Sequence, residues 1–335
     1  MLETAISEKI ELVDRPRRMR ATAASRALVR ETRLSPRQLV APLFLVPGRE
    51  RREPIPSMPG HERMSPELAV EYARRLAGLH VGGLLLFGVP DEKDDVGNGA
   101  ADASGPVPAT LRLLRDADLP MVMIADVCLC EYTSHGHCGV LDGRRIDNDR
   151  TLPLLAAAAV AYAEAGAHVV APSAMMDGQV VALRAGLDEA DLQDTAIMAY
   201  ASKHASFLYG PFREAAGSAP SFGDRRSYQM DSANGREAMR EMDLDAGEGA
   251  DILMVKPAIT SLDLLARARD RFELPLAAYQ VSGEFAMIEA AAANGWIDRR
   301  GAALETLTAI RRAGADVIMT YFAEDAARWL AEEGA

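Results

Sequence analysis

Short runs of hydrophobic residues recur along the chain, and stretches with the spacing of amphipathic helices separate them. Each run is nearly continuous instead of alternating, as expected for parallel strands that are buried on both faces. The eight runs cover residues 39–46, 81–89, 121–127, 168–171, 196–201, 251–255, 276–281 and 316–321. The pattern therefore predicts eight parallel strands.

The stretches between the runs carry helix start and stop signals. Ser65 followed by Pro66 is typical of a helix start, and Gly295 and Gly314 stand where helical stretches stop. Helices are expected over residues 154–166, 233–247, 262–272, 284–294 and 302–313. Eight strand–helix units in a chain of this length predict a (β/α)8 TIM barrel over residues 36–335. An open doubly wound sheet is the rival, but no G-x-G-x-x-G follows the first strand.

The bulk composition excludes several classes of protein. Of 335 residues, 49% are hydrophobic, and 37 Lys and Arg against 49 Asp and Glu give a net charge of −12. That charge makes nucleic acid and anionic membranes poor partners, and no apolar run approaches the roughly 18 residues of a membrane span. Residues 1–35 are polar, and acidic residues precede their basic cluster, unlike a transit peptide. We expect a cytoplasmic protein with a polar N-terminal arm.

All three cysteines of the chain, Cys128, Cys130 and Cys138, fall within eleven positions, with His135 and His137 among them. Packing cysteines would not cluster in this way, and an odd count in a long chain argues against a disulfide framework. Three thiolates with an open fourth position indicate a catalytic zinc ion. Either histidine could instead close the zinc tetrahedron, although we favour a hydrogen-bonding role for both.

Polar residues stand where the predicted strands end, which is where a TIM barrel carries its chemistry. Asp126 lies near the end of the third strand, and Ser173 follows the fourth. Lys203 and Lys256 follow the fifth and sixth strands. Two ammonium groups in one pocket repel each other and burial disfavours charge, so both effects lower a lysine pKa and leave a nucleophilic amine. The pair predicts Schiff-base chemistry, with zinc able to polarise a second carbonyl or bind an amine.

Residues 209–231 form the longest stretch without a clear period, and long loops in compact domains are usually functional lids or disordered. The aromatic residues of this stretch favour a lid that packs when closed. It also contains Arg213 and Arg225, and guanidinium groups hold carboxylates through paired hydrogen bonds. Beside a pair of lysines, these arginines suggest a small keto acid as the substrate.

Five segments of the chain resemble the porphobilinogen synthase family, also called delta-aminolevulinic acid dehydratase. They lie at residues 126–139, 198–213, 222–231, 254–257 and 279–285, in the order of the family. The resemblance implies a TIM barrel whose N-terminal arm, residues 1–35, wraps a neighbouring subunit, usually in a homo-octamer. It also implies a lyase that condenses two molecules of 5-aminolevulinate into porphobilinogen with loss of two waters, an early step of haem biosynthesis.

The same resemblance implies roles for residues that match the family's motifs. Lys256 resembles the lysine that forms the Schiff base with the propionate-side substrate, and Lys203 resembles the second lysine, on the acetate side. Three cysteines match the ligands of the catalytic zinc: Cys128, Cys130 and Cys138. The remaining matches are substrate contacts: Arg213, Arg225 and Gln229 on the acetate side, Ser282 and Tyr321 on the propionate side, and Asp126 and Ser173 at the same mouth.

Two further positions bear on the resemblance. Glu241, on the helix before the sixth strand, matches an allosteric magnesium ligand of many bacterial and plant members. Ala174 stands where the family usually has Asp, which removes a possible hydrogen-bond acceptor near the lysines and bears on catalytic rate more than on fold. Two other functions stay open: a Schiff-base aldolase, which needs neither the thiolates nor two lysines, and a non-catalytic paralogue that binds zinc or ligand.

Overall fold

The structure, a computed structural model, describes residues 13–334. The chain divides into two compact units, Met1–Arg33 and Leu34–Ala335. Residues 1–12 of the predicted arm lie outside the described part of the chain.

The described part of the first unit contains two short helices, a 3-10 helix at Pro16–Arg20 and α1 at Ala23–Leu28. The Thr22 hydroxyl accepts a hydrogen bond from the Ser25 amide at 3.0 Å and so caps α1. Neither of these two helices, as far as the structure describes them, has a buried residue. The unit therefore has no core of its own among the described residues.

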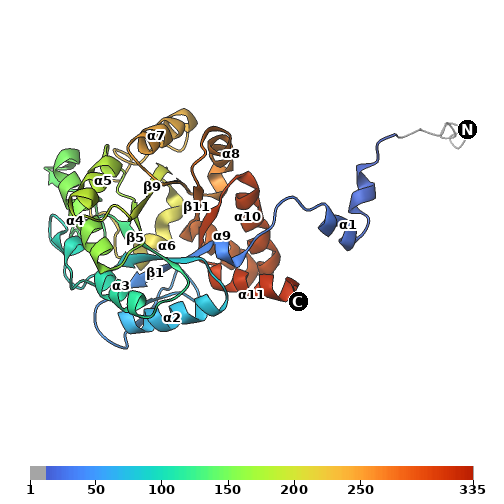
Figure 1. Cartoon of the computed structure of the whole chain (residues 1–335), viewed down its shortest axis with the longest axis horizontal. Coiled ribbons are helices and arrows are strands. Elements are labelled where there is room, and N and C mark those ends of the chain that lie inside the picture. The colour runs from blue at the N-terminus through green and yellow to red at the C-terminus, as the bar shows by residue number, and fades with distance from the viewer. Residues whose placement is uncertain (1–12, 335) are drawn as a thin grey trace, which may run out of the picture. The chain divides into compact units, whose positions relative to one another are not determined.

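The second unit is a closed barrel of parallel strands, seen from one end in Figure 1. Neighbouring barrel strands pair in chain order, and Leu39 of the first strand pairs with Ile318 of the last, which closes the barrel. Each predicted run overlaps one barrel strand, so the (β/α)8 prediction is confirmed. The strands are β1 (Leu39–Leu45), β4 (Gly83–Gly88), β5 (Val122–Val127), β8 (Val169–Pro172), β9 (Ala196–Lys203), β10 (Ile252–Lys256), β11 (Leu276–Gln280) and β12 (Val317–Thr320).

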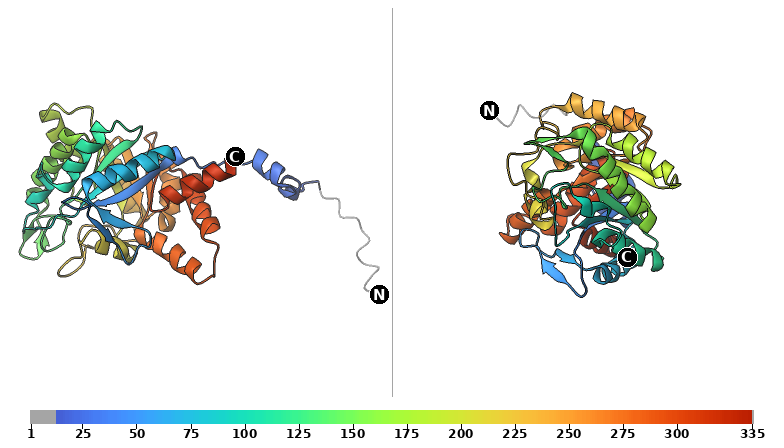
Figure 2. Two further views of the ribbon diagram at one scale, coloured as in Figure 1. Left: turned by 90° about the horizontal axis from the view of Figure 1, so that it is seen from below. Right: turned by 90° about the vertical axis from the view of Figure 1, so that its left-hand side faces the viewer.

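Helices surround the strands, as Figures 1 and 2 show from three directions. The surrounding helices are α2 (Pro66–Gly78), α3 (Pro106–Asp116), α4 (Asn148–Ala165), α5 (Gln179–Glu189), α7 (Gly235–Gly247), α8 (Leu262–Arg271), α10 (Arg299–Ala313) and α11 (Ala323–Gly334). Two additional helices follow β9 and β11: α6 (Gly210–Ala215) and α9 (Ser282–Ala293). Two small hairpins complete the unit: β2 (Arg52–Pro54) with β3 (Glu62–Met64), and β6 (Leu141–Asp142) with β7 (Arg145–Ile146).

The observed helix bounds differ from the predicted ones for local reasons. Helix α4 begins before residue 154, because the Asp147 carboxylate caps it by accepting a hydrogen bond from the Arg150 amide at 3.1 Å. Helix α7 begins after residue 233, because Asp231 accepts a hydrogen bond from the Ala233 amide at 2.9 Å and holds a turn there. Helix α6 was not predicted, since six residues are too few to show a helical period.

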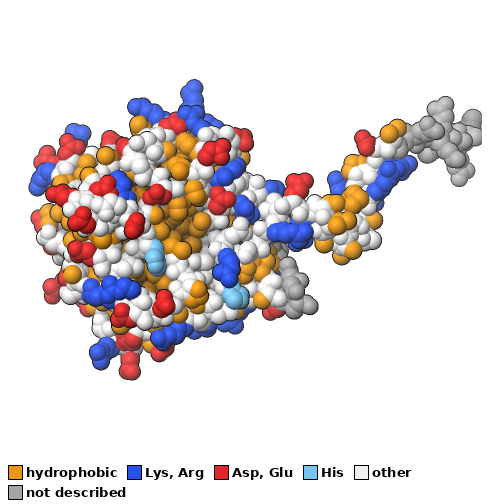
Figure 3. All heavy atoms as spheres, in the orientation of Figure 1, with side chains coloured by type: hydrophobic (Ala, Val, Ile, Leu, Met, Phe, Trp, Pro, Cys, Tyr) orange, Lys and Arg blue, Asp and Glu red, His pale blue; other side chains and the backbone are white. Residues whose placement is uncertain are grey.

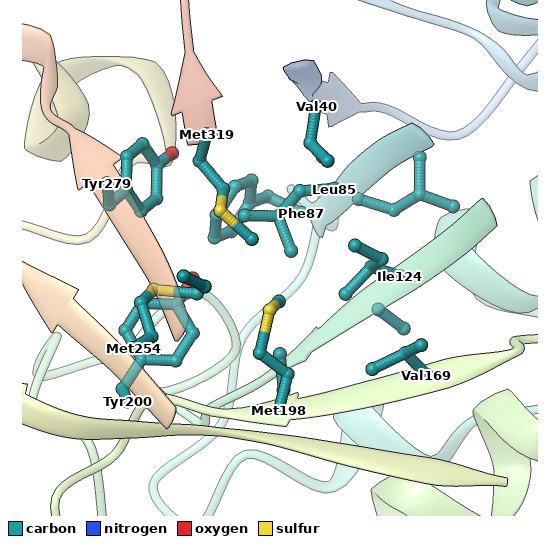
Figure 4. Packing of buried hydrophobic residues seen from close by; sticks show 14 of the residues in the cluster. Val40, Leu85, Phe87, Ile124, Val169, Met198, Tyr200, Met254, Tyr279 and Met319 are labelled. Atoms are coloured by element: carbon teal, nitrogen blue, oxygen red, sulfur yellow. The ribbon is translucent and has the colours of Figure 1, made fainter. Parts of the chain in front are cut away.

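The inside of the barrel is a packed hydrophobic core (Figure 4). Side chains from all eight strands point towards a common centre, as the layers of a TIM barrel require. The labelled ones are Val40, Leu85, Phe87, Ile124, Val169, Met198, Tyr200, Met254, Tyr279 and Met319. This core fixes which face of each strand points inwards, and therefore which residues at the strand ends reach the site.

One face of the barrel unit carries many charged side chains (Figure 3). Figure 3 shows acidic and basic side chains spread over one face, with a hydrophobic area near its middle. Within residues 13–334, no helix has both the length and the apolar character that crossing a bilayer requires.

Candidate active site

The inward face of the barrel strands continues into the predicted site. Ile124 of β5 and Met254 of β10 point into the barrel (Figure 4). Because side chains on a strand alternate between its faces, Asp126 and Lys256, two positions further on, point the same way. Both residues are buried at the carboxyl ends of their strands. The structure thus places them where the barrel hypothesis requires catalytic side chains.

Lys203 and Lys256 are partners in the parallel register of β9 and β10 and form the last residues of these strands. Tyr200 points into the barrel (Figure 4), so regular alternation would turn Lys203 to the outer face. The register instead shifts between Leu253 and Val255, as at a β-bulge. This shift brings Lys203 to the same side as Lys256.

Aromatic rings surround the Lys256 amine. Burial, assisted by the charge of Lys203, lowers the pKa of Lys256 to about 7, while Asp126 acts in the opposite direction. Much of Lys256 is therefore an uncharged nucleophile at neutral pH. Four ring centroids lie within 5.2 Å of its Nζ, those of Tyr279, Tyr200, Phe212 and Tyr209.

Asp126, Ser173 and Lys203 form a hydrogen-bonded group beside the lysine pair. The Ser173 hydroxyl donates to Asp126 Oδ2 at 2.9 Å, and Lys203 Nζ donates to the Ser173 carbonyl oxygen. Asp126 Oδ1 is buried and has no hydrogen-bond partner among the described residues. Burial raises the pKa of Asp126 to about 6, although the charges of Lys203 and Lys256 oppose this rise. The predicted residues of these strand ends thus share one polar network.

The three thiols form a compact triangle on the turn that follows β5. Cys128, Cys130 and Cys138 are buried, and their sulfur atoms all lie within 4.8 Å of one another. Hydrogen bonds from Cys128 and Cys130 lower the pKa of Cys138, and the charge of Arg225 acts in the same direction. Thiolates bound to one zinc ion at about 2.3 Å are roughly 3.8 Å apart, so the triangle has the size that one tetrahedral ion needs. The structure thus brings together three thiols that can hold a metal ion.

Both histidines of the cysteine turn are engaged by protein atoms. His135 Nε2 donates to the Asp95 carbonyl at 3.0 Å, and His135 Nδ1 accepts from the His137 amide at 3.1 Å. His137 Nε2 donates to the Phe222 carbonyl at 3.0 Å, which leaves Nδ1 to accept from the Tyr228 hydroxyl at 3.1 Å. All four ring nitrogens therefore have a partner, which supports hydrogen-bonding roles over metal ligation.

Residues 209–231, called the lid segment below, lie against the cysteine turn. Arg225 Nη2 donates to the carbonyl oxygens of Gly136 at 2.8 Å and Ser218 at 2.6 Å. In the described part of the chain, Nε of Arg213, Nε of Arg225 and both amide atoms of Gln229 are buried without a hydrogen-bond partner. Buried polar atoms are rarely left unpaired, so this set is suited to a polar ligand such as a carboxylate.

Ser282 and Tyr321 lie near the aromatic surroundings of Lys256. The Tyr321 hydroxyl is 3.0 Å from the hydroxyl of Tyr279, whose ring faces the Lys256 amine. Ser282 begins α9, and its Oγ accepts a hydrogen bond from the Phe212 amide of the lid segment at 2.9 Å. Both residues predicted as propionate-side contacts thus lie beside groups that touch Lys256.

Glu241 lies on α7 and lines a cavity of about 710 Å³. Asp177, Glu237 and Asp245 line the same cavity, as does Gln229. Burial raises the pKa of Glu241, and the charges of Asp177 and Glu237 raise it further. Burial likewise raises the pKa of Asp245 to about 8. The cavity therefore gathers carboxyl groups whose mutual repulsion a bound cation would relieve.

A model of the family described as Delta-aminolevulinic acid dehydratase matches residues 13–329 of the chain. The chain belongs to the delta-aminolevulinic acid dehydratase family. The dehydratase of Mycobacterium tuberculosis is 55% identical over 320 residues, which cover 94% of this chain and 97% of that protein. The dehydratase of Synechococcus elongatus is 50% identical over 321 residues, covering 95% of this chain and 98% of that protein.

A solved structure of a delta-aminolevulinic acid dehydratase also matches this chain. It is the porphobilinogen synthase of Toxoplasma gondii ME49, in complex with the reaction product porphobilinogen. The two structures have a TM-score of 0.94 at 43% sequence identity, and the match covers 96% of this chain and 93% of that chain. The whole barrel therefore has the fold of a dehydratase with its product bound.

Sequence reasoning missed the aromatic residues that surround Lys256 in this dehydratase-family site. Tyr200 could have been found by alternation on β9, because it lies two positions after the inward-pointing Met198 (Figure 4). Tyr279 stands on the inner face of β11 by the same rule. Phe212 was among the aromatic residues expected to pack a closed lid, but its position beside Lys256 was not predicted, since it belongs to the unpredicted helix α6.

The structure also shows how this dehydratase-family site accommodates Ala174. Ala174 is fully buried. Lys203 donates to the carbonyl oxygen of the preceding Ser173, so its ammonium group has an acceptor although residue 174 carries no carboxylate. Asp177, the next acidic residue along the chain, instead lines the cavity of Glu241.

Proposed function

We propose that this chain is a porphobilinogen synthase, which condenses two molecules of 5-aminolevulinate into porphobilinogen with loss of two waters. Its membership of the delta-aminolevulinic acid dehydratase family supports the proposal. The observation that carries it is the register partnership of Lys203 and Lys256, with the pKa of Lys256 lowered to about 7. An uncharged buried amine at a barrel mouth is the group that forms a Schiff base with a ketone.

In the proposed reaction, Lys256 attacks the ketone carbon of the first 5-aminolevulinate. The adduct loses water and becomes a Schiff base, and its carboxylate is held by Ser282 and Tyr321. The aromatic rings around Lys256 leave its amine almost fully buried. A substrate carbon bonded to this amine is therefore shielded from water. Carbon–carbon and carbon–nitrogen bonds then form with the second substrate, and the second water is lost. Cleavage of the bond between carbon and Lys256 Nζ releases porphobilinogen and returns the lysine as a free amine.

The second substrate occupies the side of Lys203 in this proposal. Its carboxylate accepts hydrogen bonds from the unpartnered N–H groups of Arg213, Arg225 and Gln229, which gives these buried donors the partners they lack among the described residues. Asp126 and Ser173, which are hydrogen-bonded to each other, line the same space in this proposal. The lid segment closes over both substrates and excludes water.

We propose zinc as the ion held by Cys128, Cys130 and Cys138. Three soft sulfur ligands at this spacing suit zinc and leave one position of a tetrahedron for substrate. Bound there, zinc would supply Lewis acidity towards the second substrate. The three free thiols also suit a reducing compartment, and we place the protein in the cytoplasm.

We further propose magnesium as a regulatory ion at Glu241. The carboxyl groups of Asp177 and Glu237 in the same cavity support this proposal, because their charges already disfavour ionisation of Glu241. Hard carboxylate oxygens are the ligands that magnesium prefers. Activation by magnesium in the native chain, and its loss in Glu241→Gln, is the expected result.

The N-terminal unit is proposed to serve assembly into a homo-oligomer, an octamer as implied by the family resemblance. Met19, Leu28 and Val29 are 44%, 80% and 48% exposed, and apolar side chains on so short a segment need a partner surface to cover them. Sedimentation of the full chain against a chain lacking residues 1–33 tests this role. The shortened chain is expected to form smaller assemblies.

Borohydride reduction tests the proposed function. The chain contains four lysines, Lys9, Lys93, Lys203 and Lys256, so peptide mass spectrometry can locate a trapped adduct. With 5-aminolevulinate and borohydride, we expect added mass on Lys256. In a separate reaction without borohydride, we expect porphobilinogen, which gives a coloured adduct with an aldehyde reagent. Unimpaired turnover by Lys256→Ala would refute the mechanism, and Lys93 provides an unlabelled internal control.

A further inference from the structure

Glu284, at the third position of α9, carries a fully buried carboxylate that joins two loops of the barrel mouth. Its Oε2 accepts a hydrogen bond from the Val281 amide at 2.8 Å, at the end of β11. Its Oε1 accepts a hydrogen bond from the Ile259 amide at 2.8 Å. Glu284 has 0% of its surface exposed, so bulk water does not supply further hydrogen bonds to its carboxyl group. The loop of Ile259 begins directly after Lys256, the lysine proposed to form the Schiff base.

An ordinary helix cap explains only half of this arrangement. A glutamate at the third position of a helix commonly reaches back to the amide before the helix, and Oε2 of Glu284 does so. Such a cap contributes about 1 kcal/mol and works at the protein surface. Burying a carboxylate away from water costs several kcal/mol unless its hydrogen bonds are complete. The second bond, across to Ile259, is therefore the distinctive feature of Glu284.

The two residues before Glu284 contact the lid segment and Leu208, the residue directly before that segment. Ser282 Oγ accepts from the Phe212 amide at 2.9 Å, and the Phe212 ring centroid lies 5.1 Å from Lys256 Nζ. Gly283 allows a close approach, because a Cβ atom on it would lie 2.5 Å from the Leu208 carbonyl oxygen. The start of α9 therefore contacts both the lid segment and the loop after β10. Among the hydrogen bonds that the structure describes, Glu284 makes the only one between α9 and that loop.

We propose that Glu284 is a positioning residue, which holds the loop after Lys256 in a fixed relation to Ser282 and the lid segment. It does not touch the reacting atoms. The Ala258 amide also donates to the Tyr279 carbonyl at 2.9 Å, so the loop is tied to β11 itself. Among the described side chains, the Glu284 carboxyl group then links this loop to the start of α9, where Ser282 lies. This inference rests on the proposed function, because it assigns Glu284 to the geometry of the Lys256 reaction.

The test replaces Glu284 with groups of nearly the same shape. Glu284→Gln keeps the size of the side chain, but its NH2 group cannot accept a hydrogen bond, so one of the two loops loses its acceptor. A displacement of the order of 1 Å can lower turnover by about 100-fold. We expect kcat of Glu284→Gln, and the rate of borohydride trapping at Lys256, to fall at least tenfold per folded subunit. Metal content is expected to stay unchanged, because the cysteine turn is untouched.

Two companion variants sharpen the result. Glu284→Asp keeps the carboxyl group but is too short to reach both loops, so an intermediate kcat is expected. This variant decides the matter if Glu284→Gln does not fold. Asp298→Asn is the matched control, because Asp298 caps α10 through the Gly301 amide at 2.6 Å on an exposed surface. Its kcat and trapping rate are expected to stay within twofold of the native values.

The outcomes separate this inference from the proposed function. A native chain that forms no porphobilinogen and traps no adduct on Lys256 refutes the proposed function, and the inference with it. A native chain that does both, while Glu284→Gln and Glu284→Asp keep native kcat and trapping rates, refutes the positioning role alone. Loss of folded protein with an unchanged trapping rate in the folded fraction would show a purely structural role and would also refute it.

Discussion

Lys203 and Lys256 lie side by side as register partners on two neighbouring parallel strands, and a register shift earlier in the pair makes this possible. Their charges are therefore coupled by the backbone geometry of the barrel. Burial and this coupling together lower the pKa of Lys256 to about 7, with Asp126 opposing them. A substantial part of the Lys256 amine is therefore uncharged near pH 7, which is the state that can attack a carbonyl.

The first prediction concerns the pH dependence of trapping at Lys256. Only the uncharged amine attacks a carbonyl, so the trapping rate should rise with pH and reach half its maximum near pH 7 in the native chain. Lys203→Met removes a neighbouring positive charge, which raises the pKa of Lys256. The midpoint should move to higher pH, and trapping at pH 7 should fall several-fold. A midpoint that moves to lower pH would contradict the assigned electrostatics.

The second prediction separates the thiols from the histidines as metal ligands. Cys138→Ser should lose most of the bound metal, because two remaining thiols hold zinc poorly. His137→Gln should keep its metal, since both nitrogens of His137 already bond to Phe222 and Tyr228. Metal content per subunit, measured by elemental analysis after dialysis, checks both variants. Equal losses in the two would make His137 a ligand.

The third prediction concerns the attachment of the lid segment. Arg63 donates to the carbonyl oxygens of Ala215 and Glu214, each at 2.6 Å, at the C-terminal end of α6. Arg63→Ala leaves these carbonyl groups without that cation, which weakens the last turn. We expect a higher KM for 5-aminolevulinate and faster tryptic cleavage at Arg213 and Arg225. Exposed Arg74→Ala, on α2, is the control and should change neither quantity.

The fourth prediction tests packing at the amino end of the barrel strands, where Gly82 directly precedes β4. A Cβ atom on Gly82 would lie 2.1 Å from the Arg37 carbonyl oxygen, so Gly82→Ala must displace backbone. Overpacking of this kind costs about 1–3 kcal/mol, which should lower the thermal midpoint. Gly78, at the end of α2, has no atom within 4 Å of such a Cβ, and Gly78→Ala should stabilise the helix by up to about 1 kcal/mol. Equal midpoints for the two variants would contradict this account.

The barrel could be predicted from the sequence because its strands are buried on both faces and appear as continuous hydrophobic runs. The lysines could be singled out because they stand just after two of these runs, and the thiols because all three cysteines of the chain cluster within eleven positions. The mutual register of Lys203 and Lys256 could not, since alternation from Tyr200 places residue 203 on the outer face, and the register shift that corrects this has no signature in residue types. Helix α6 and the contact of Glu284 with Ile259 depend on tertiary packing between distant segments.

The ammonium group of Lys203 takes its acceptor from the main chain, at Ser173, and not from a side chain. A carbonyl oxygen is supplied by every amino acid, so mutation of residue 173 or 174 cannot delete this partner. Lys203 therefore keeps this acceptor whether residue 174 carries a carboxylate or a methyl group.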